Sequence, residues 1–194
     1  MVSDLIGRRR LIALGGAAAL TGFAMPLRAQ ESAGANATPA VPRNIGSFRT
    51  IQWRDHFDDL THGAIVCDTA SRALHYWSED ESIYLLHPCS VPRSEEYTRR
   101  GRTRVVLKRR NPVWIPTPSM REEDPSLPAR VEAGPDNPMG TRAMNLGWQY
   151  YRIHGIDNPE KIGRPASSGC FGLFNDAAEH LFELVEIGTQ VVVI

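Results

Sequence analysis

Two side chains near the C-terminal end of the sequence have the chemistry of a nucleophile and its base. His154 ends a short extended-looking run, and Cys170 follows three small residues, Ser167, Ser168 and Gly169. A cysteine thiol has a pKa of about 8.5, so an imidazole that takes its proton supplies the reactive thiolate at neutral pH. The N–H groups of the turn could then hold an oxyanion. The segment predicts acyl transfer through a thiol, although a buried free cysteine is often only a small apolar core residue.

The residues around this pair resemble the L,D-transpeptidase (YkuD) family. That family's signature is a His-Gly or His-Ser pair, a spacer with Ile-Gly, and then Ser/Thr-His-Gly-Cys. The matching residues here are His154-Gly155, Ile162-Gly163, Ser168-Gly169-Cys170, the upstream segment Asn137–Leu146 and the downstream pair Asn175-Asp176. The similarity covers roughly residues 63–194.

The resemblance implies an enzyme that transfers acyl groups on peptidoglycan stem peptides through a thioester on Cys170. His154 would be the base and acid, and the region of the Gly155 carbonyl is where a group that orients the imidazole is expected. Ser168 and Gly169 would form the oxyanion turn. No metal or organic cofactor enters this chemistry. The acyl acceptor would be a second stem peptide or an outer-membrane protein, which gives cross-linking or attachment to the wall, or water, which gives carboxypeptidase-type trimming.

Substrate-binding residues are expected in two places. A segment from Asn111 to Pro138 holds seven of the chain's 14 prolines, so it is predicted to be a long loop. The resemblance implies that this loop flanks the catalytic groove. Trp114 and Met120 of this loop are candidates to line the site, although Trp114 could instead only anchor the loop on the core. The further candidates are Arg142, Met144, Arg152 and Arg164.

The sequence departs from the family pattern at two positions. Ser168 replaces the usual second histidine, which leaves His154 as the only base. Gly172 stands where the family commonly has an arginine, a side chain that can bind a carboxylate in a two-point manner. If that arginine holds substrate, the substitution Gly172→Arg is expected to increase acylation. If glycine is instead required there, for a positive φ or for room, the arginine is expected to lower activity and stability together. Two other functions stay open: a weakly catalytic module that binds peptidoglycan, and an unrelated exported thiol hydrolase.

The elements that would position the site are mainly strands, as in an L,D-transpeptidase-like β-sandwich (α+β). Trp53, Phe57 and Leu60 have helical spacing and predict a short N-terminal amphipathic helix over residues 52–60. A longer helix is predicted over Asp176–Glu186, after the cysteine, with Asn175 as its N-cap. The predicted strands cover residues 64–67, 73–77, 82–87, 102–108, 143–146, 151–154 and 189–194.

The N-terminal region predicts export. Arg8, Arg9 and Arg10 precede a Gly/Ala-rich apolar run, which fits a twin-arginine signal over residues 1–29 and a location in the periplasm. The run is too short and glycine-rich for a permanent membrane span, which needs about 20 apolar residues. An Ala/Pro/Asn/Gly/Ser linker over 30–46 follows, and then one catalytic domain over 47–194.

Charge and cysteine content limit the remaining possibilities. The whole chain has 22 basic and 22 acidic residues, and cleavage after Ala29 would leave 18 basic against 21 acidic ones, so no nucleic-acid footprint is present. Of the three cysteines, Cys67 and Cys89 lie in or beside predicted strands. A disulfide between them is possible in an exported protein, but strand position does not give the Cα separation that a disulfide requires.

Overall fold

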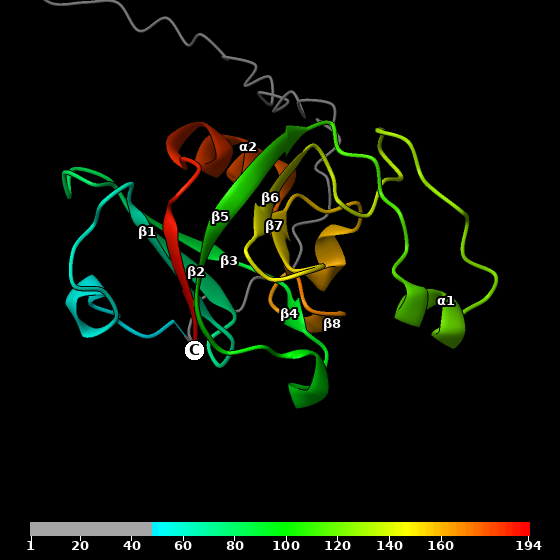
Figure 1. Cartoon of the computed structure of the whole chain (residues 1–194), viewed down its shortest axis with the longest axis horizontal. Helices are drawn as coiled ribbons and strands as arrows, with labels where there is room; N and C mark the ends of the chain where they lie inside the picture. Colours follow the sequence, from blue (N-terminus) through cyan, green and yellow to red (C-terminus); the bar gives the residue numbers. More distant parts are fainter. Residues whose placement is uncertain (1–47) are drawn as a thin grey trace, which may run out of the picture. The chain divides into compact units, whose positions relative to one another are not determined.

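A computed structural model describes residues 48–194 of the chain (Figure 1). The expected signal over residues 1–29 and the expected linker over 30–46 lie outside the described residues. The described part is a mainly-β fold built on one curled sheet with two α-helices, which confirms the predicted fold class. Among the described residues, no helix has the length and apolar character that a membrane span requires.

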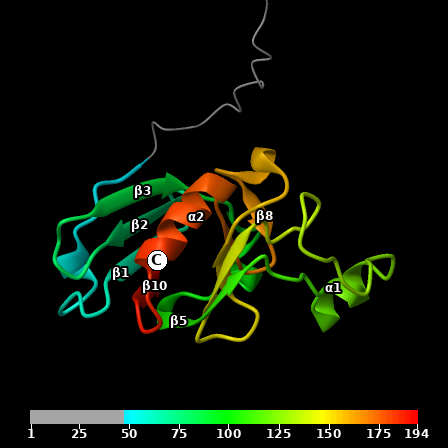
Figure 2. The same ribbon diagram turned by 90° about the horizontal axis from the view of Figure 1, so that it is seen from above.

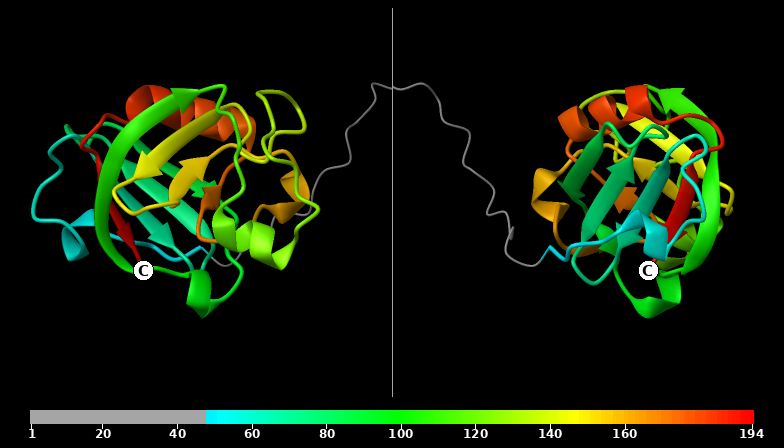
Figure 3. Two further views of the ribbon diagram at one scale, coloured as in Figure 1. Left: turned by 45° about the vertical axis from the view of Figure 1, so that its right-hand side comes forward. Right: turned by 90° about the vertical axis from the view of Figure 1, so that its left-hand side faces the viewer.

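The main sheet has eight strands in the order β3-β2-β1-β10-β5-β6-β7-β9. Their bounds are β1 Ala64–Asp68, β2 Ala73–Trp77, β3 Tyr84–Pro88, β5 Gly101–Arg110, β6 Arg142–Leu146, β7 Arg152–His154, β9 Phe171–Gly172 and β10 Gln190–Val193. Strand β5 is long and strongly curved, with an irregular register between Val105 and Leu107, and it connects the two halves of the sheet (Figure 3). A separate small sheet pairs β4 (Val91–Pro92) with β8 (Pro165–Ser167) in parallel.

The helices are short and few. Helix α2 (Asn175–Leu184) lies across the sheet, whereas α1 (Pro118–Glu123) lies away from it in the long loop (Figure 2). Three 3₁₀ turns complete the described elements: η2 Trp53–Asp55, η3 Glu95–Tyr97 and η4 Pro159–Lys161. In α1, Pro118 lies in the first turn, and the Thr117 side chain accepts a hydrogen bond from the Met120 N–H. Proline is tolerated in the first turn because the N–H that it lacks would have no partner within the helix there.

Strand β1 is buried along its whole length because both faces of the sheet are covered there. Ile65 and Cys67 point into the larger cluster of buried residues, which includes Leu181 of α2. Ala64 and Val66 point into a second cluster formed with the N-terminal segment. The alternation of side chains along a strand thus divides one apolar run between two cores.

Most predicted strands are confirmed with small shifts of their ends. Strands β1 and β2 form the expected antiparallel hairpin, with Ala64 opposite Trp77. The predicted closing strand is β10, which pairs in parallel with β1 and antiparallel with β5. Strands β4, β8 and β9 were not predicted, because each has only two or three residues and pairs with segments far away in the sequence.

Both helix predictions need correction. The expected helix over residues 52–60 is only the turn η2, although Phe57 and Leu60 are buried as its spacing predicted. Its chain turns away early because the Asp59 carboxylate accepts the Thr61 N–H in a local turn that competes with a helix. Helix α2 forms where expected, but its N-cap is Phe174 and Asn175 lies inside it.

Candidate active site

His154 and Cys170 are positioned by two neighbouring parallel strands. His154 ends β7 and lies opposite Gly172 of β9, while Ile153 lies opposite Phe171. Cys170 therefore precedes β9 beside Arg152. Because side chains alternate along strands, Arg152, His154, Cys170 and Gly172 share one face of the sheet, whereas Ile153 and Phe171 point into the core. Two residues that are distant in sequence are thereby placed over the same face.

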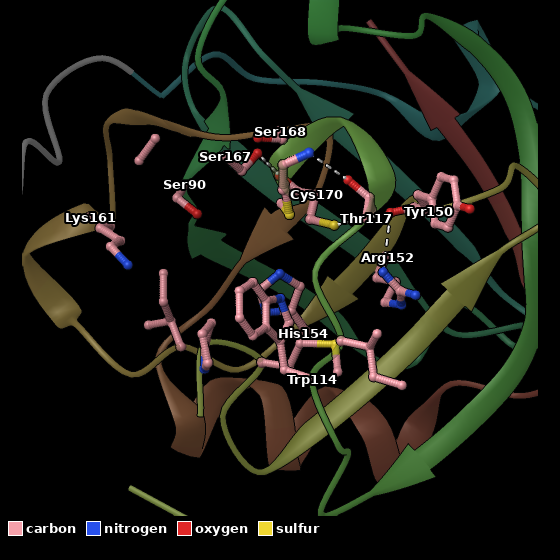
Figure 4. Close-up of a pocket in the computed structure, with 16 residues that line it drawn as sticks. Ser90, Trp114, Thr117, Tyr150, Arg152, His154, Lys161, Ser167, Ser168 and Cys170 are labelled. Atoms are coloured by element: carbon pink, nitrogen blue, oxygen red, sulfur yellow. Dashed lines mark hydrogen bonds between the residues drawn. The ribbon is translucent and has the colours of Figure 1, made fainter. Parts of the chain in front are cut away.

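This face lines a cavity of about 290 Å³ (Figure 4). The long loop supplies one wall, and the sheet and the cysteine turn supply the other. The residues that line the cavity are Ser90, Trp114, Ile115, Thr117, Met120, Pro138, Met139, Tyr150, Arg152, His154, Ile156, Lys161, Ala166, Ser167, Ser168 and Cys170. The expected loop residues Trp114 and Met120 are both among them.

The carbonyl of Gly155 fixes the tautomer of the His154 imidazole. His154 Nδ1 lies against Gly155 O, and a carbonyl can only accept, so Nδ1 carries the proton and Nε2 is left as the basic nitrogen. Burial lowers the pKa of His154 to about 4. The hydrogen bond to Gly155 O acts in the opposite direction, but its effect on the pKa is smaller. The ring is thus neutral at pH 7 and able to accept a proton.

The thiol is also neutral in this arrangement. Burial raises the pKa of Cys170, although the positive charge of Arg152 acts to lower it. The Sγ–H group donates to the Tyr150 carbonyl at 3.4 Å, and the same carbonyl accepts from Arg152 Nη1 at 3.3 Å. Tyr150 presents this oxygen from a backbone with φ of +68°, which is unusual for a bulky residue. The resting pair is a thiol and a neutral imidazole, and proton transfer is left for the reaction.

Ser167 holds the cysteine turn together. Its hydroxyl donates to the Cys170 carbonyl at 2.6 Å and accepts from the Gly169 N–H at 3.3 Å. Gly169 has φ of +125°, and a Cβ there would lie 3.1 Å from the ring of Tyr151, so the position requires glycine. Ser168, which stands in place of the family's second histidine, lines the cavity. Sequence reasoning missed the role of Ser167 because both serines of the SSGC stretch are equivalent without coordinates.

Asn175 secures the Gly155 peptide from the side of α2. Its carboxamide oxygen accepts from the Thr141 N–H at 3.2 Å, and its nitrogen donates to the Ile156 carbonyl at 3.1 Å. A Cβ on Gly155 would lie 2.1 Å from the Asn175 oxygen, so glycine is needed for this close approach. Asn175 was predicted to cap α2. Instead it links Thr141, just before β6, to the segment whose Gly155 carbonyl accepts the hydrogen bond from His154.

The residues on either side of β4 form hydrogen bonds with the cysteine turn and with β9. Ser90 forms a bridge with Gly172, in which Ser90 N donates to Gly172 O at 2.8 Å and Gly172 N donates to Ser90 O at 3.2 Å. The Ser90 hydroxyl accepts from the same Gly172 N–H at 3.1 Å. Arg93 N donates to Ser167 O at 2.8 Å. No local pattern marks Ser90, since its partner lies some eighty positions further along the chain.

The loop over residues 111–140 is organised by a buried amide. The Asn137 side chain donates to the carbonyls of Pro112, Val131 and Glu132, and it accepts from the Met139 N–H at 2.8 Å. A bridge between Trp114 and Val131 closes the same loop with two hydrogen bonds of 2.9 Å. The wall of the cavity is therefore a hydrogen-bonded structure despite its proline content.

The candidate substrate-binding residues fall into two groups. Trp114 and Arg152 line the cavity, as expected. Met144 does not, because the register of β6 points it into the core, where it is fully buried. Arg142 lies on that same face, with its guanidinium 5.6 Å from the centre of the Phe182 ring. Arg164 is exposed outside the cavity.

The two remaining cysteines are buried in the core as free thiols. Burial raises the pKa of both Cys67 and Cys89. Neither lines the cavity, so among the described residues Cys170 is the single thiol at this site. The described residues contain no group of three potential metal ligands.

A thiol and a buried neutral imidazole line one cavity, which makes this cavity the candidate active site. The L,D-transpeptidase catalytic domain family, YkuD, matches residues 62–193. The chain belongs to this family of enzymes.

Individual relatives agree with this assignment. A Fuscovulum blasticum protein, named as an L,D-transpeptidase in the ATP synthase subunits region, is 43% identical over 194 residues and is covered in full, as is this chain. Escherichia coli ErfK/SrfK, also named as an L,D-transpeptidase, is 38% identical over 154 residues, which cover 77% of this chain and 49% of that protein. The chain thus spans about half the length of ErfK/SrfK.

Solved structures show the same fold. An L,D-transpeptidase from Mycobacterium smegmatis superposes with a TM-score of 0.51 at 21% identity, covering 69% of this chain and 58% of that one. An L,D-transpeptidase from Mycobacterium tuberculosis H37Rv gives a TM-score of 0.52 at 18% identity, covering 69% and 57%. At these identities the likeness concerns the fold alone.

Proposed function

We propose that this domain is a cysteine-dependent L,D-transpeptidase that acts on peptidoglycan stem peptides through a thioester on Cys170. The observation that carries the proposal is the shared cavity, in which Cys170 faces the same space as an imidazole whose basic Nε2 is fixed by Gly155 O. The family assignment supports the substrate class. We further propose that the protein works in the periplasm after twin-arginine export.

In the first half-reaction, His154 Nε2 takes the proton from Cys170 Sγ, and the sulfur attacks the carbonyl carbon at the L-centre of a stem-peptide diamino acid. The N–H of Gly169 already pairs with Ser167, so the amide of Cys170 is the proposed donor to the oxyanion. Collapse of the tetrahedral intermediate breaks the C–N bond. His154 gives its proton to the departing amine of the D-residue, and the acyl group remains on sulfur as a thioester.

In the second half-reaction, an acceptor amine attacks the thioester. His154 takes one proton from the amine, the C–S bond breaks, and the sulfur leaves as a thiolate that recovers the proton from the imidazole. An amine of a second stem peptide gives a cross-link, and an amine of an outer-membrane protein attaches that protein to the wall. Water in place of the amine gives trimming.

The proposal is tested with synthetic stem peptides and single variants. Cys170→Ser and His154→Ala are each expected to abolish turnover. Cys67→Ala and Cys89→Ala are the matched controls, since each removes a thiol outside the cavity, and we expect both to retain activity. Near-wild-type turnover by Cys170→Ser would contradict the nucleophile assignment. Export is tested separately: unchanged periplasmic recovery after Arg8 and Arg9 are both replaced by lysine would contradict the twin-arginine route.

A further inference from the structure

A second, smaller cavity adjoins the catalytic one. Its volume is about 160 Å³, and it shares Ile115, Met139 and Arg152 with the catalytic cavity. The rest of its lining is Arg109, Val113, Ala143 and Asn145. Arg152 therefore stands between the thiol and this second space, and in Figure 4 it lies beside Tyr150, to one side of Cys170 and His154.

The strand register places the polar groups of this cavity on the catalytic face. Arg109 of β5 lies opposite Ala143 of β6, and Ala143 lies opposite His154. Asn145 lies opposite Arg152. Residues that face each other across strands point to the same side of a sheet, so Arg109 and Asn145 share the face that carries the catalytic pair.

The two guanidinium groups have no acidic partner. Among residues 48–194, no carboxylate lies within 4.0 Å of Arg109 or Arg152. Arg110, the next residue on β5, points to the other face and pairs with Glu183 at 2.9 Å. Two unpaired cations beside one cavity favour an anionic ligand, and guanidinium groups suit carboxylates in particular.

Asn145 provides an independent sign of a ligand. Its side-chain oxygen is buried and has no hydrogen-bond partner. Buried polar atoms without a partner are uncommon in folded proteins. An amide oxygen only accepts hydrogen bonds, so the group that completes its bonding would be an N–H of the ligand, while the carboxylate is left to the arginines. Here the atom belongs to a residue that lines the same cavity as the two arginines.

We infer that the second cavity is a subsite for the terminal carboxylate of the D-residue that the enzyme expels; this rests on the proposed function. That carboxylate lies one residue beyond the attacked carbonyl, a step of about 3.8 Å between Cα positions. With the carbonyl at Cys170, the carboxylate reaches Arg152, and Arg109 adds the second charge. Arg109 is thus a specificity-determining residue, because it binds the substrate carboxylate, which glycine at position 172 cannot do.

The test compares two synthetic stem peptides that differ only at the C-terminus, one with a free carboxylate and one with a carboxamide. We expect wild-type protein to use the carboxylate donor at least about tenfold better in kcat/KM, because a charge-assisted hydrogen bond is lost with the amide. Arg109→Gln should lower kcat/KM for the carboxylate donor by about tenfold and leave the carboxamide donor nearly unchanged. Arg109→Lys should keep part of the preference. Melting temperatures of the variants show that each is folded.

Arg110→Gln is the matched control, since it makes the same change at the adjacent residue of the same strand on the other face. It should leave the preference unaltered. Retention of the full carboxylate preference by Arg109→Gln would overturn the subsite, and so would a wild-type protein that turns over both donors equally, while either result leaves the proposed function standing. Turnover of neither donor by the wild-type protein would refute the proposed function and the subsite with it.

Discussion

The substitution Gly172→Arg, which restores the residue common in the family, is expected to damage this protein. The sequence favoured a gain in acylation and left a loss of activity and stability as the alternative. A Cβ added at Gly172 would lie 2.5 Å from the Ser90 hydroxyl and 2.9 Å from Cδ1 of Ile156, both closer than real Cβ contacts. The backbone at this position is not in the positive-φ region, so the obstacle is space alone. The Ser90 side chain occupies the volume that the stem of an arginine needs.

The cost follows from two effects. Overpacking of a buried position costs about 1–3 kcal/mol, and displacement of Ser90 loses the hydrogen bond from Gly172 N, worth about 0.5–1.5 kcal/mol. The sum of about 1.5–4.5 kcal/mol corresponds to a fall in melting temperature of roughly 3–18 °C for a domain of this size. Gly172 lies two residues after Cys170 and opposite His154, so a shift of this strand also misplaces the thiol. We expect acylation to slow by at least about tenfold.

The assay combines thermal unfolding by circular dichroism with the rate of Cys170 acylation by a carbapenem. Gly172→Ala adds the Cβ alone and should show a smaller loss of stability. The double substitution Ser90→Gly with Gly172→Arg removes the main obstacle and should recover part of the melting temperature. If Gly172→Arg melted within about one degree of wild type and acylated as fast or faster, the steric argument would be refuted.

Further predictions concern the residues around the catalytic pair and the loop wall. Asn175→Ala leaves the Thr141 N–H and the Ile156 carbonyl without their partner, which costs about 1–3 kcal/mol of stability for each group. We expect a lower kcat with KM nearly unchanged, and an equal fall in kcat and KM would argue against a role of Asn175 in positioning His154. Asn137→Ala should open the loop wall, seen as faster proteolysis within residues 111–140, and unchanged cleavage would contradict its role. Because the pKa of His154 is lowered from 6.5 to about 4, the acid limb of kcat/KM should lie near pH 4, and a limb near 6.5 would refute the buried neutral base. The same shift predicts loss of stability as pH falls from about 7 to 4, since only the unfolded chain binds that proton; a His154→Gln variant should lose less.

The sequence predicted strands such as β1, β2 and β10 well because each is a nearly continuous run of buried, mostly apolar residues. Residues 64–67 and 73–77, for example, fill two cores at once and pair as a hairpin. That His154 and Cys170 share a cavity was also expected, because their residue types and spacing lie within one short segment. Their placement on adjacent strands then follows from the parallel pairing of β7 with β9.

Non-local contacts account for what the sequence did not predict. Met144 was expected at the site, but the register of β6 turns it into the core and turns Asn145 outward. The obstacle at Gly172 comes from Ser90, which no local pattern connects to the cysteine turn. The arginine that borders the thiol, Arg152, was one of several candidates that spacing could not separate. Such features depend on which distant segments pair, and the pairing is not marked by any local pattern in the sequence.

Intact-protein mass spectrometry after incubation with a carbapenem tests most directly whether Cys170 is the nucleophile. Acylation requires the Cys170 thiol, the basic Nε2 of His154 and an oxyanion donor to be assembled in one cavity. We expect one adduct per chain on the wild-type protein, located on the peptide that contains Cys170, and none on Cys170→Ala. An unmodified wild-type protein, or an adduct that persists in Cys170→Ala, would contradict the assignment of Cys170 as the nucleophile of an assembled active site.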